Sequence, residues 1–147
     1  METLLGKNLR NRDFEEIGIE KLKEAQLVGL YFSSRNCPPS KKFSDLLLEF
    51  YQEINCDAYH FEIVWMSVDS EEEEYKKTMT KIPWLSLPYN DPKIKDIISK
   101  FGVTSIPKLL ILTPNGTKVT EEGRTDICQK GEVAFEKWSK MIPINSA

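Results

Sequence analysis

Two runs of apolar residues predict buried strands, at 27–32 and 61–68. Neither run alternates regularly between apolar and polar residues, which is typical of strands in a parallel sheet covered by helices on both faces. Between them, Pro38 and Pro39 fit the first turn of a helix, where no backbone donor is needed. Apolar residues then recur at three- and four-residue spacing and predict the buried face of this helix: Phe43, Leu46, Leu47, Phe50 and Ile54.

The rest of the chain predicts shorter elements. A small strand or hairpin within 4–17 precedes a short helix at 19–25, and Ser70 with Glu73 matches a capping box for another helix. The acidic run at 71–74 is more typical of a solvated first helical turn than of a metal or partner site. In chain order, the later segments predict a helix at 93–101, a strand at 108–112, a tight turn at 114–116, a strand at 117–120 and a helix at 131–141.

The order of these elements predicts the fold class. A strand–helix–strand crossover followed by an antiparallel pair gives an α/β fold, with a central mixed β-sheet flanked by helices on both faces. No internal repeat, low-complexity tract or Gly/Ser linker interrupts the sequence. We therefore expect a single domain over 1–147, with an N-terminal extension at 1–25 and a core at 27–141.

Composition excludes several classes of function. Of the 147 residues, 40% are apolar and 29% are charged, with a net charge of −3, which favours a soluble globular protein without affinity for nucleic acid or membrane surfaces. No apolar stretch approaches the roughly 20 residues that span a bilayer. The beginning at Met1 lacks the pattern of a secretory signal and the cysteine count of 3 is odd, so we expect a reducing, cytoplasmic location. The single histidine, His60, excludes multi-histidine zinc sites, and we expect no metal or organic cofactor.

The chemistry centres on Cys37, which lies where a buried strand ends and a helix begins. The unpaired N–H groups and positive dipole of a helix N-terminus stabilise a thiolate. Arg35, Lys41 and Lys42 lie close in sequence and add positive charge. Because the thiolate is the reactive form, this pattern predicts a nucleophilic cysteine rather than a buried inert one.

Four segments together resemble the tryparedoxin and nucleoredoxin branch of the thioredoxin superfamily, and nucleoredoxin-like proteins in particular. They lie at 31–39, 63–69, 82–88 and 101–107, and the resemblance extends over most of the chain. It implies a thioredoxin-like fold and thiol–disulfide exchange. The family motif is Trp-Cys-Pro-Pro-Cys, whereas this sequence has Asn36 in place of the Trp and Ser40 in place of the second, resolving cysteine.

The resemblance also implies roles for residues around the sulfur. Asn36, Pro38 and Pro39 would contact the substrate, and Ile106-Pro107 would be the cis-proline loop that pairs with the substrate backbone. A serine cannot form a disulfide, so Cys37 would act alone through mixed disulfides, and the Ser40 hydroxyl would donate a hydrogen bond to its thiolate. The implied partners are thiol or disulfide proteins and glutathione or a related small thiol.

Two other interpretations stay open. In the first, the chain is a non-enzymatic binding or redox-signalling module with a thioredoxin fold. In the second, Ser40 is an engineered replacement that traps a mixed disulfide in an active tryparedoxin. Recovery of insulin reductase activity in Ser40→Cys would be compatible with the second interpretation.

The remaining candidates depend on their position relative to the sheet. His60 precedes the second strand, at the end opposite Cys37, so it cannot be the base for that thiol. Asp69 follows the same strand and lies at the Cys37 end, where we expect it first to cap a helix. Cys56 is expected to be a bystander. Cys128 follows the returning strand, and we hypothesise that it substitutes as the resolving thiol.

Overall fold

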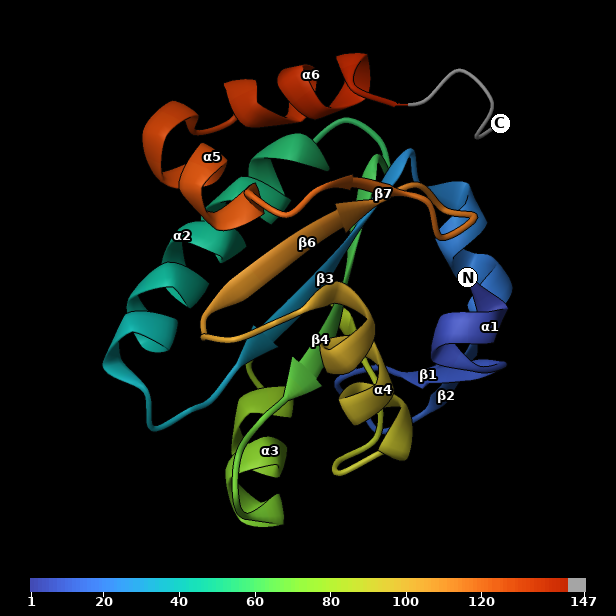
Figure 1. Cartoon of the computed structure of the whole chain (residues 1–147), viewed down its shortest axis with the longest axis vertical. Coiled ribbons are helices and arrows are strands. Elements are labelled where there is room, and N and C mark those ends of the chain that lie inside the picture. The colour runs from blue at the N-terminus through green and yellow to red at the C-terminus, as the bar shows by residue number, and fades with distance from the viewer. Residues whose placement is uncertain (143–147) are drawn as a thin grey trace.

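Within residues 1–142, which the computed structural model describes, seven strands form one mixed sheet in the order β2-β1-β5-β4-β3-β6-β7 (Figure 1). The strands are β1 (Asn8–Arg10), β2 (Glu16–Gly18), β3 (Leu27–Ser33), β4 (Phe61–Ser67), β5 (Leu85–Ser86), β6 (Lys108–Leu112) and β7 (Lys118–Thr120). The helices are α1 (Glu2–Leu5), the 3-10 helix η1 (Ile19–Glu24), α2 (Pro38–Ile54), α3 (Glu72–Met79), α4 (Pro92–Phe101), α5 (Gly123–Lys130) and α6 (Val133–Lys140).

Strand β3 lies near the middle of the sheet and determines where the loop before α2 emerges. It pairs in parallel with β4, from Leu27 opposite Phe61 to Ser33 opposite Ser67. On its other side it pairs with β6 in antiparallel fashion. Every residue of β3 and β4 is buried, so the predicted two-sided burial and the mixed α/β sheet are confirmed.

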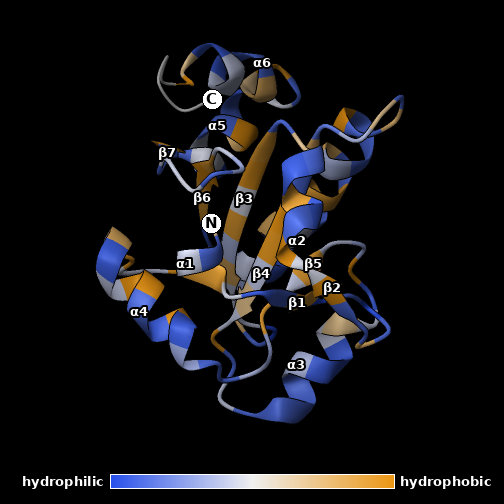
Figure 2. Cartoon of the chain, turned by 90° about the vertical axis from the view of Figure 1, so that its right-hand side faces the viewer, coloured by the Kyte–Doolittle hydropathy of each residue, from blue (hydrophilic) through white to orange (hydrophobic). Residues whose placement is uncertain are grey.

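The two faces of the sheet carry separate apolar clusters. Alternate side chains of β3, β4 and β6 pack against α2, α3, α5 and α6 on one face, and the intervening side chains pack against α1, η1 and α4 on the other. Figure 2 shows the apolar strands enclosed by helices whose hydrophilic sides face outward. No helix within residues 1–142 combines the length and hydrophobicity needed to cross a membrane.

Three details of the expected helices are wrong. Leu46 is 44% exposed rather than on the buried face of α2. The predicted capping box is absent, because α3 begins at Glu72 and its N-cap residue, Glu71, makes no side-chain cap. The final helix is preceded by α5, and the two are separated at Gly131, whose φ of +57° is favourable only for glycine. The sequence of α5 has little apolar periodicity, with Ile127 as its buried apolar residue, so the pattern gave no sign of it.

Candidate functional site

Cys37 occupies the N-cap position of α2 and follows the short loop that leaves β3. Pro38 begins the helix, and the Cys37 carbonyl accepts a hydrogen bond from the backbone N–H of Lys41 at 3.0 Å in its first turn. The residue is partly exposed, so its sulfur is not sealed in the apolar core. The predicted position between a buried strand and a helix start is therefore confirmed.

The pKa of the Cys37 thiol is lowered chiefly by Ser40. The Ser40 side chain, and then its backbone, can donate to a thiolate at this position; burial opposes this effect, and the positive charge of Arg124 makes a smaller favourable contribution. The Ser40 side chain is itself buried, and its Oγ has no hydrogen-bond partner in the described part of the chain, so its hydroxyl is free to donate to the sulfur. A neutral thiol is a weak acceptor, whereas a thiolate provides a charge-assisted partner for this hydroxyl.

Tyr31 of β3 forms hydrogen bonds with the first turns of α2. Its side chain is buried in β3, and its hydroxyl donates to the Ser40 carbonyl at 3.3 Å and pairs with Ser44 Oγ at 2.7 Å. Burial raises the pKa of the Tyr31 phenol above its ordinary value. The Tyr31 phenol is therefore neutral, and its hydrogen bond to the Ser40 carbonyl helps to fix the position of Ser40.

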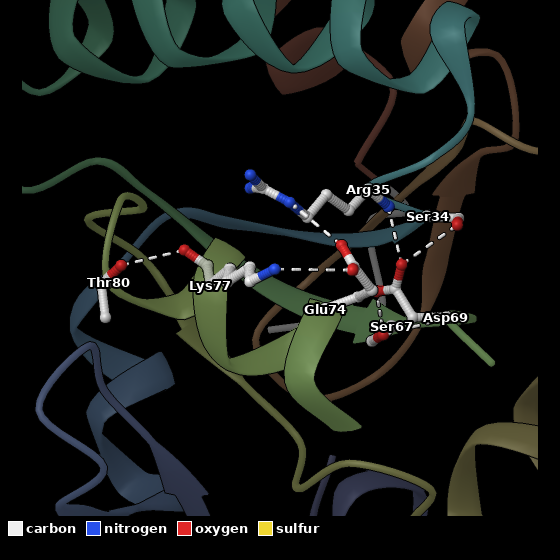
Figure 3. A network of polar contacts seen from close by, with 7 residues as sticks. All are labelled: Ser34, Arg35, Ser67, Asp69, Glu74, Lys77 and Thr80. Atoms are coloured by element: carbon white, nitrogen blue, oxygen red, sulfur yellow. Dashed lines mark hydrogen bonds and ion pairs between the residues drawn. The ribbon is translucent and has the colours of Figure 1, made fainter. Parts of the chain in front are cut away.

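The loop before Cys37 is held by Asp69, which follows β4. Its Oδ1 accepts hydrogen bonds from the backbone N–H of Arg35 at 2.7 Å and from Ser34 Oγ at 3.0 Å, while Oδ2 accepts from Ser67 (Figure 3). Asp69 does lie at the Cys37 end of the sheet, as predicted. The expectation that it caps a helix is wrong, because it binds the loop instead.

Arg124 is a site residue that sequence reasoning missed. It lies in the first turn of α5, and its Nη1 donates to the carbonyl of Pro107 at 3.4 Å. The Ile106-Pro107 peptide bond is cis, as the resemblance implied. The next residue, Lys108, pairs with Phe32 of β3, so the cis-proline loop lies beside the strand end that leads to Cys37. Only the missed helix α5 brings Arg124 to this loop, and no sequence motif indicates it.

The cationic residues next to the cysteine in sequence are not among the groups that lower its pKa. Arg35 Nε forms an ion pair with Glu74 Oε2 at 3.1 Å, and Lys41 is exposed on the first turn of α2. Their thiolate-stabilising role stays a prediction, since the groups found to lower the pKa of Cys37 are Ser40 and Arg124. Asn36, Pro38 and Pro39 are exposed around the sulfur, where a partner can reach them.

The other two cysteines are exposed, and all three are free thiols. Cys56 lies beyond the C-terminal end of α2. Cys128, on α5, lines a groove together with Pro38 and Arg124, so it faces the same side of the molecule as the start of α2. Its proposed resolving role stays a prediction.

His60 lies at the opposite end of the sheet, as predicted. Its carbonyl accepts from the backbone N–H of Leu27, at the start of β3, and its ring contacts Asp57. A strand of this length separates it from the Cys37 end by roughly 20 Å. Within residues 1–142, no group of three or more His, Cys, Asp or Glu side chains is placed to hold a metal ion.

Comparison with known proteins gives concordant matches in sequence and structure. The sequence model of a family described as Thioredoxin-like matches residues 25–118. Nucleoredoxin of Mus musculus is 34% identical over 138 residues, which cover 93% of this chain but 31% of that protein. The chain thus spans about a third of the length of this relative.

Solved tryparedoxin structures cover nearly the whole chain. Native tryparedoxin I from Crithidia fasciculata superimposes with a TM-score of 0.81 at 30% identity, covering 89% of this chain and 92% of that one. A tryparedoxin II complexed with glutathionylspermidine superimposes with a TM-score of 0.78 at 30% identity, covering 86% and 88% of the two chains.

Proposed function

We propose that this chain, which belongs to the thioredoxin-like family in the branch of the tryparedoxins and nucleoredoxins, is a thiol–disulfide oxidoreductase that works through the single nucleophile Cys37. The observation that carries the proposal is the partly exposed thiol at the start of α2, whose pKa is lowered by Ser40. Ser40 stands where the family has its second cysteine, so the group that would resolve a mixed disulfide is replaced by one that stabilises a thiolate.

The reaction consists of two exchanges. The Cys37 thiolate attacks one sulfur of a substrate disulfide, its S–S bond breaks, and the other sulfur leaves as a thiolate that takes a proton from water. An external thiol, after losing its proton to water, then attacks the sulfur of the bound half, forms a disulfide with it and regenerates the Cys37 thiolate. The half of the substrate that leaves first is reduced to a thiol, and the external thiol is oxidised in a disulfide with the other half. The second step therefore needs no partner cysteine in the chain.

The substrate class follows from the surroundings of the sulfur. Asn36, Pro38 and Pro39 supply an exposed surface, and the Ile106-Pro107 loop lies beside the end of β3. We propose that these residues hold the backbone of a protein disulfide or of glutathione or a related small thiol. The tryparedoxin solved with glutathionylspermidine supports a small-thiol partner. The need for an external thiol favours a reducing location such as the cytoplasm.

Cys128 offers a second route for the resolving step. It is exposed and lines the groove that also contacts Pro38. If it substitutes for the missing cysteine, mild oxidation of the protein should yield a peptide in which Cys37 is linked to Cys128. Absence of this linked peptide would remove Cys128 from the mechanism and leave the external thiol as the resolving group.

The test is turnover of a glutathionylated peptide with reduced glutathione, coupled to glutathione reductase. We expect the wild-type chain to turn over, Cys37→Ser to fall to the uncatalysed rate, and Cys56→Ser, at the far end of α2, to retain full activity. Retained activity in Cys37→Ser would overturn the proposal. No turnover in the wild type, together with a Cys37 that alkylates like a free thiol, would instead support a non-enzymatic binding module.

A further inference from the structure

A separate cavity lies between the loop after β3, helix α2 and the segment that leads into β5. Its volume is about 340 Å³, at the lower end of the roughly 300–1,000 Å³ typical of small-molecule pockets. Part of its wall is apolar, formed by Leu48, Trp65, Ile82, Pro83 and Trp84. It is thus large enough for a small organic molecule and can pack against an aromatic or aliphatic body.

Trp84, in the wall of this cavity, has a buried N–H group without an acceptor. Its side chain is 2% exposed, and within residues 1–142 its Nε1 makes no hydrogen bond. The other two indoles are satisfied, since Trp65 Nε1 donates to Ser33 at 2.7 Å and Trp138 Nε1 donates to Asp126 at 2.8 Å. A buried donor without a partner is costly, and an indole N–H can only donate. The missing partner is therefore a hydrogen-bond acceptor.

The charge of the lining residues favours an anion. Arg35, Lys41 and Lys81 line the cavity, against one acid, Asp45. Glu74 offsets the charge of Arg35 through the ion pair drawn in Figure 3. Lys41 and Lys81 are exposed and form no ion pair with any residue in the described range 1–142. These two ammonium groups therefore leave an excess of positive charge at the cavity.

We propose that this cavity binds a small carboxylate with an apolar body. The apolar part packs against the indoles within the field of Lys41 and Lys81, and a small turn of the Trp84 ring, whose Nε1 is fully buried, lets a carboxylate oxygen accept the hydrogen bond that this nitrogen lacks. The site uses neither the Cys37 sulfur nor the cis-proline loop, but it adjoins the proposed thiol site because Arg35, Asn36 and Lys41 form part of its wall.

The test uses the reduced full chain labelled with ¹⁵N, titrated with 2-naphthoate and, as a matched neutral control, 2-naphthylmethanol. We expect 2-naphthoate to shift the indole N–H resonance of Trp84, assigned with Trp84→Phe, and to leave that of Trp138 in place. The neutral alcohol should bind more weakly. A Trp84 resonance that does not move, or equal affinity for the alcohol, would overturn the proposal.

If Trp84→Phe fails to fold, a variant with a changed surface charge tests binding to the same cavity. Lys81→Glu reverses an exposed charge at the cavity, and Lys95→Glu makes the same change on α4, away from it. We expect Lys81→Glu to weaken 2-naphthoate binding by about twofold to fivefold, the effect of exposed charge pairs, and Lys95→Glu to leave it unchanged. Equal losses in both variants would show a general charge effect and contradict the proposal.

Discussion

The carboxylate of Asp69 accepts a hydrogen bond from the backbone N–H of Arg35 at 2.7 Å, which ties the end of β4 to the loop that carries Cys37. Asp69→Ala would leave this N–H and the Ser34 hydroxyl without their acceptor. We expect a loss of about 1–3 kcal/mol in the free energy of unfolding, measured with urea. Hydrogen exchange at the Arg35 amide should become faster. Asp96→Ala, which removes an exposed acid on α4, is the control. If hydrogen exchange at the Arg35 amide is unchanged in Asp69→Ala, the hydrogen bond to Asp69 does not hold this loop.

Arg124 contributes positive charge to the site from α5. Arg124→Gln should raise the pKa of Cys37, but by less than removal of the Ser40 hydroxyl, because Ser40 is the larger cause of the lowered pKa. The pH dependence of Cys37 alkylation measures the shift, and added salt should reduce the difference from the wild type. Lys130→Gln removes a charge at the other end of the same helix. If Lys130→Gln raises the pKa of Cys37 by as much as Arg124→Gln does, the effect comes from net charge rather than from the position of Arg124.

Asp126 links stability to pH. Burial acts to raise the pKa of its carboxyl, but hydrogen bonds from Lys137 and Trp138 outweigh burial, so the pKa is lowered on folding. The unfolded chain then binds more protons, and the stability gained from Asp126 is present above its unfolded pKa of about 3.9 and is lost as the pH falls below that value.

Asp126→Asn should therefore lower the free energy of unfolding at pH 7 by about 1–3 kcal/mol, the usual loss for a buried hydrogen-bonded charge. Urea unfolding at a series of pH values should show the gap from the wild type narrowing below about pH 3.9. If the difference in free energy of unfolding between the two proteins stays constant down to the lowest pH at which they fold, the lost stability comes from packing rather than from charge.

Ser40→Cys would place a second thiol in the first turn of α2. We expect this variant to gain the ability to reduce insulin with a dithiol reductant, because a second thiol can release the mixed disulfide that Cys37 forms. Ser99→Cys adds an exposed cysteine on α4 and should bring no such gain. If Ser40→Cys and the wild type reduce insulin equally, the missing cysteine does not limit this reaction.

The central features of the fold and site were predictable because they depend on local sequence. Strands β3 and β4 show continuous burial, and Pro38 marks the start of α2, so the position of Cys37 follows directly from the sequence. The cis bond before Pro107 was predictable only through resemblance to a family, because no local pattern distinguishes it from a trans bond.

The missed features depend on tertiary contacts. Arg124 reaches Pro107 because α5 packs beside β6, and the weakly amphipathic sequence of α5 does not predict that helix. Asp69 could equally cap a helix or bind a loop, and only the parallel register of β3 and β4 places it next to Arg35. The unpartnered Trp84 indole is likewise a property of packing, which periodicity does not reveal.

The central claim, that Ser40 keeps Cys37 reactive as a thiolate, is tested most directly by the pH dependence of iodoacetamide alkylation. The protein should carry Cys56→Ser and Cys128→Ser, so that Cys37 alone reacts. We expect a midpoint below that of the same protein unfolded in urea, where a free thiol titrates at about 8.5, and a rise toward that value in Ser40→Ala. A folded midpoint equal to the unfolded one, or one that Ser40→Ala leaves unchanged, would contradict the account.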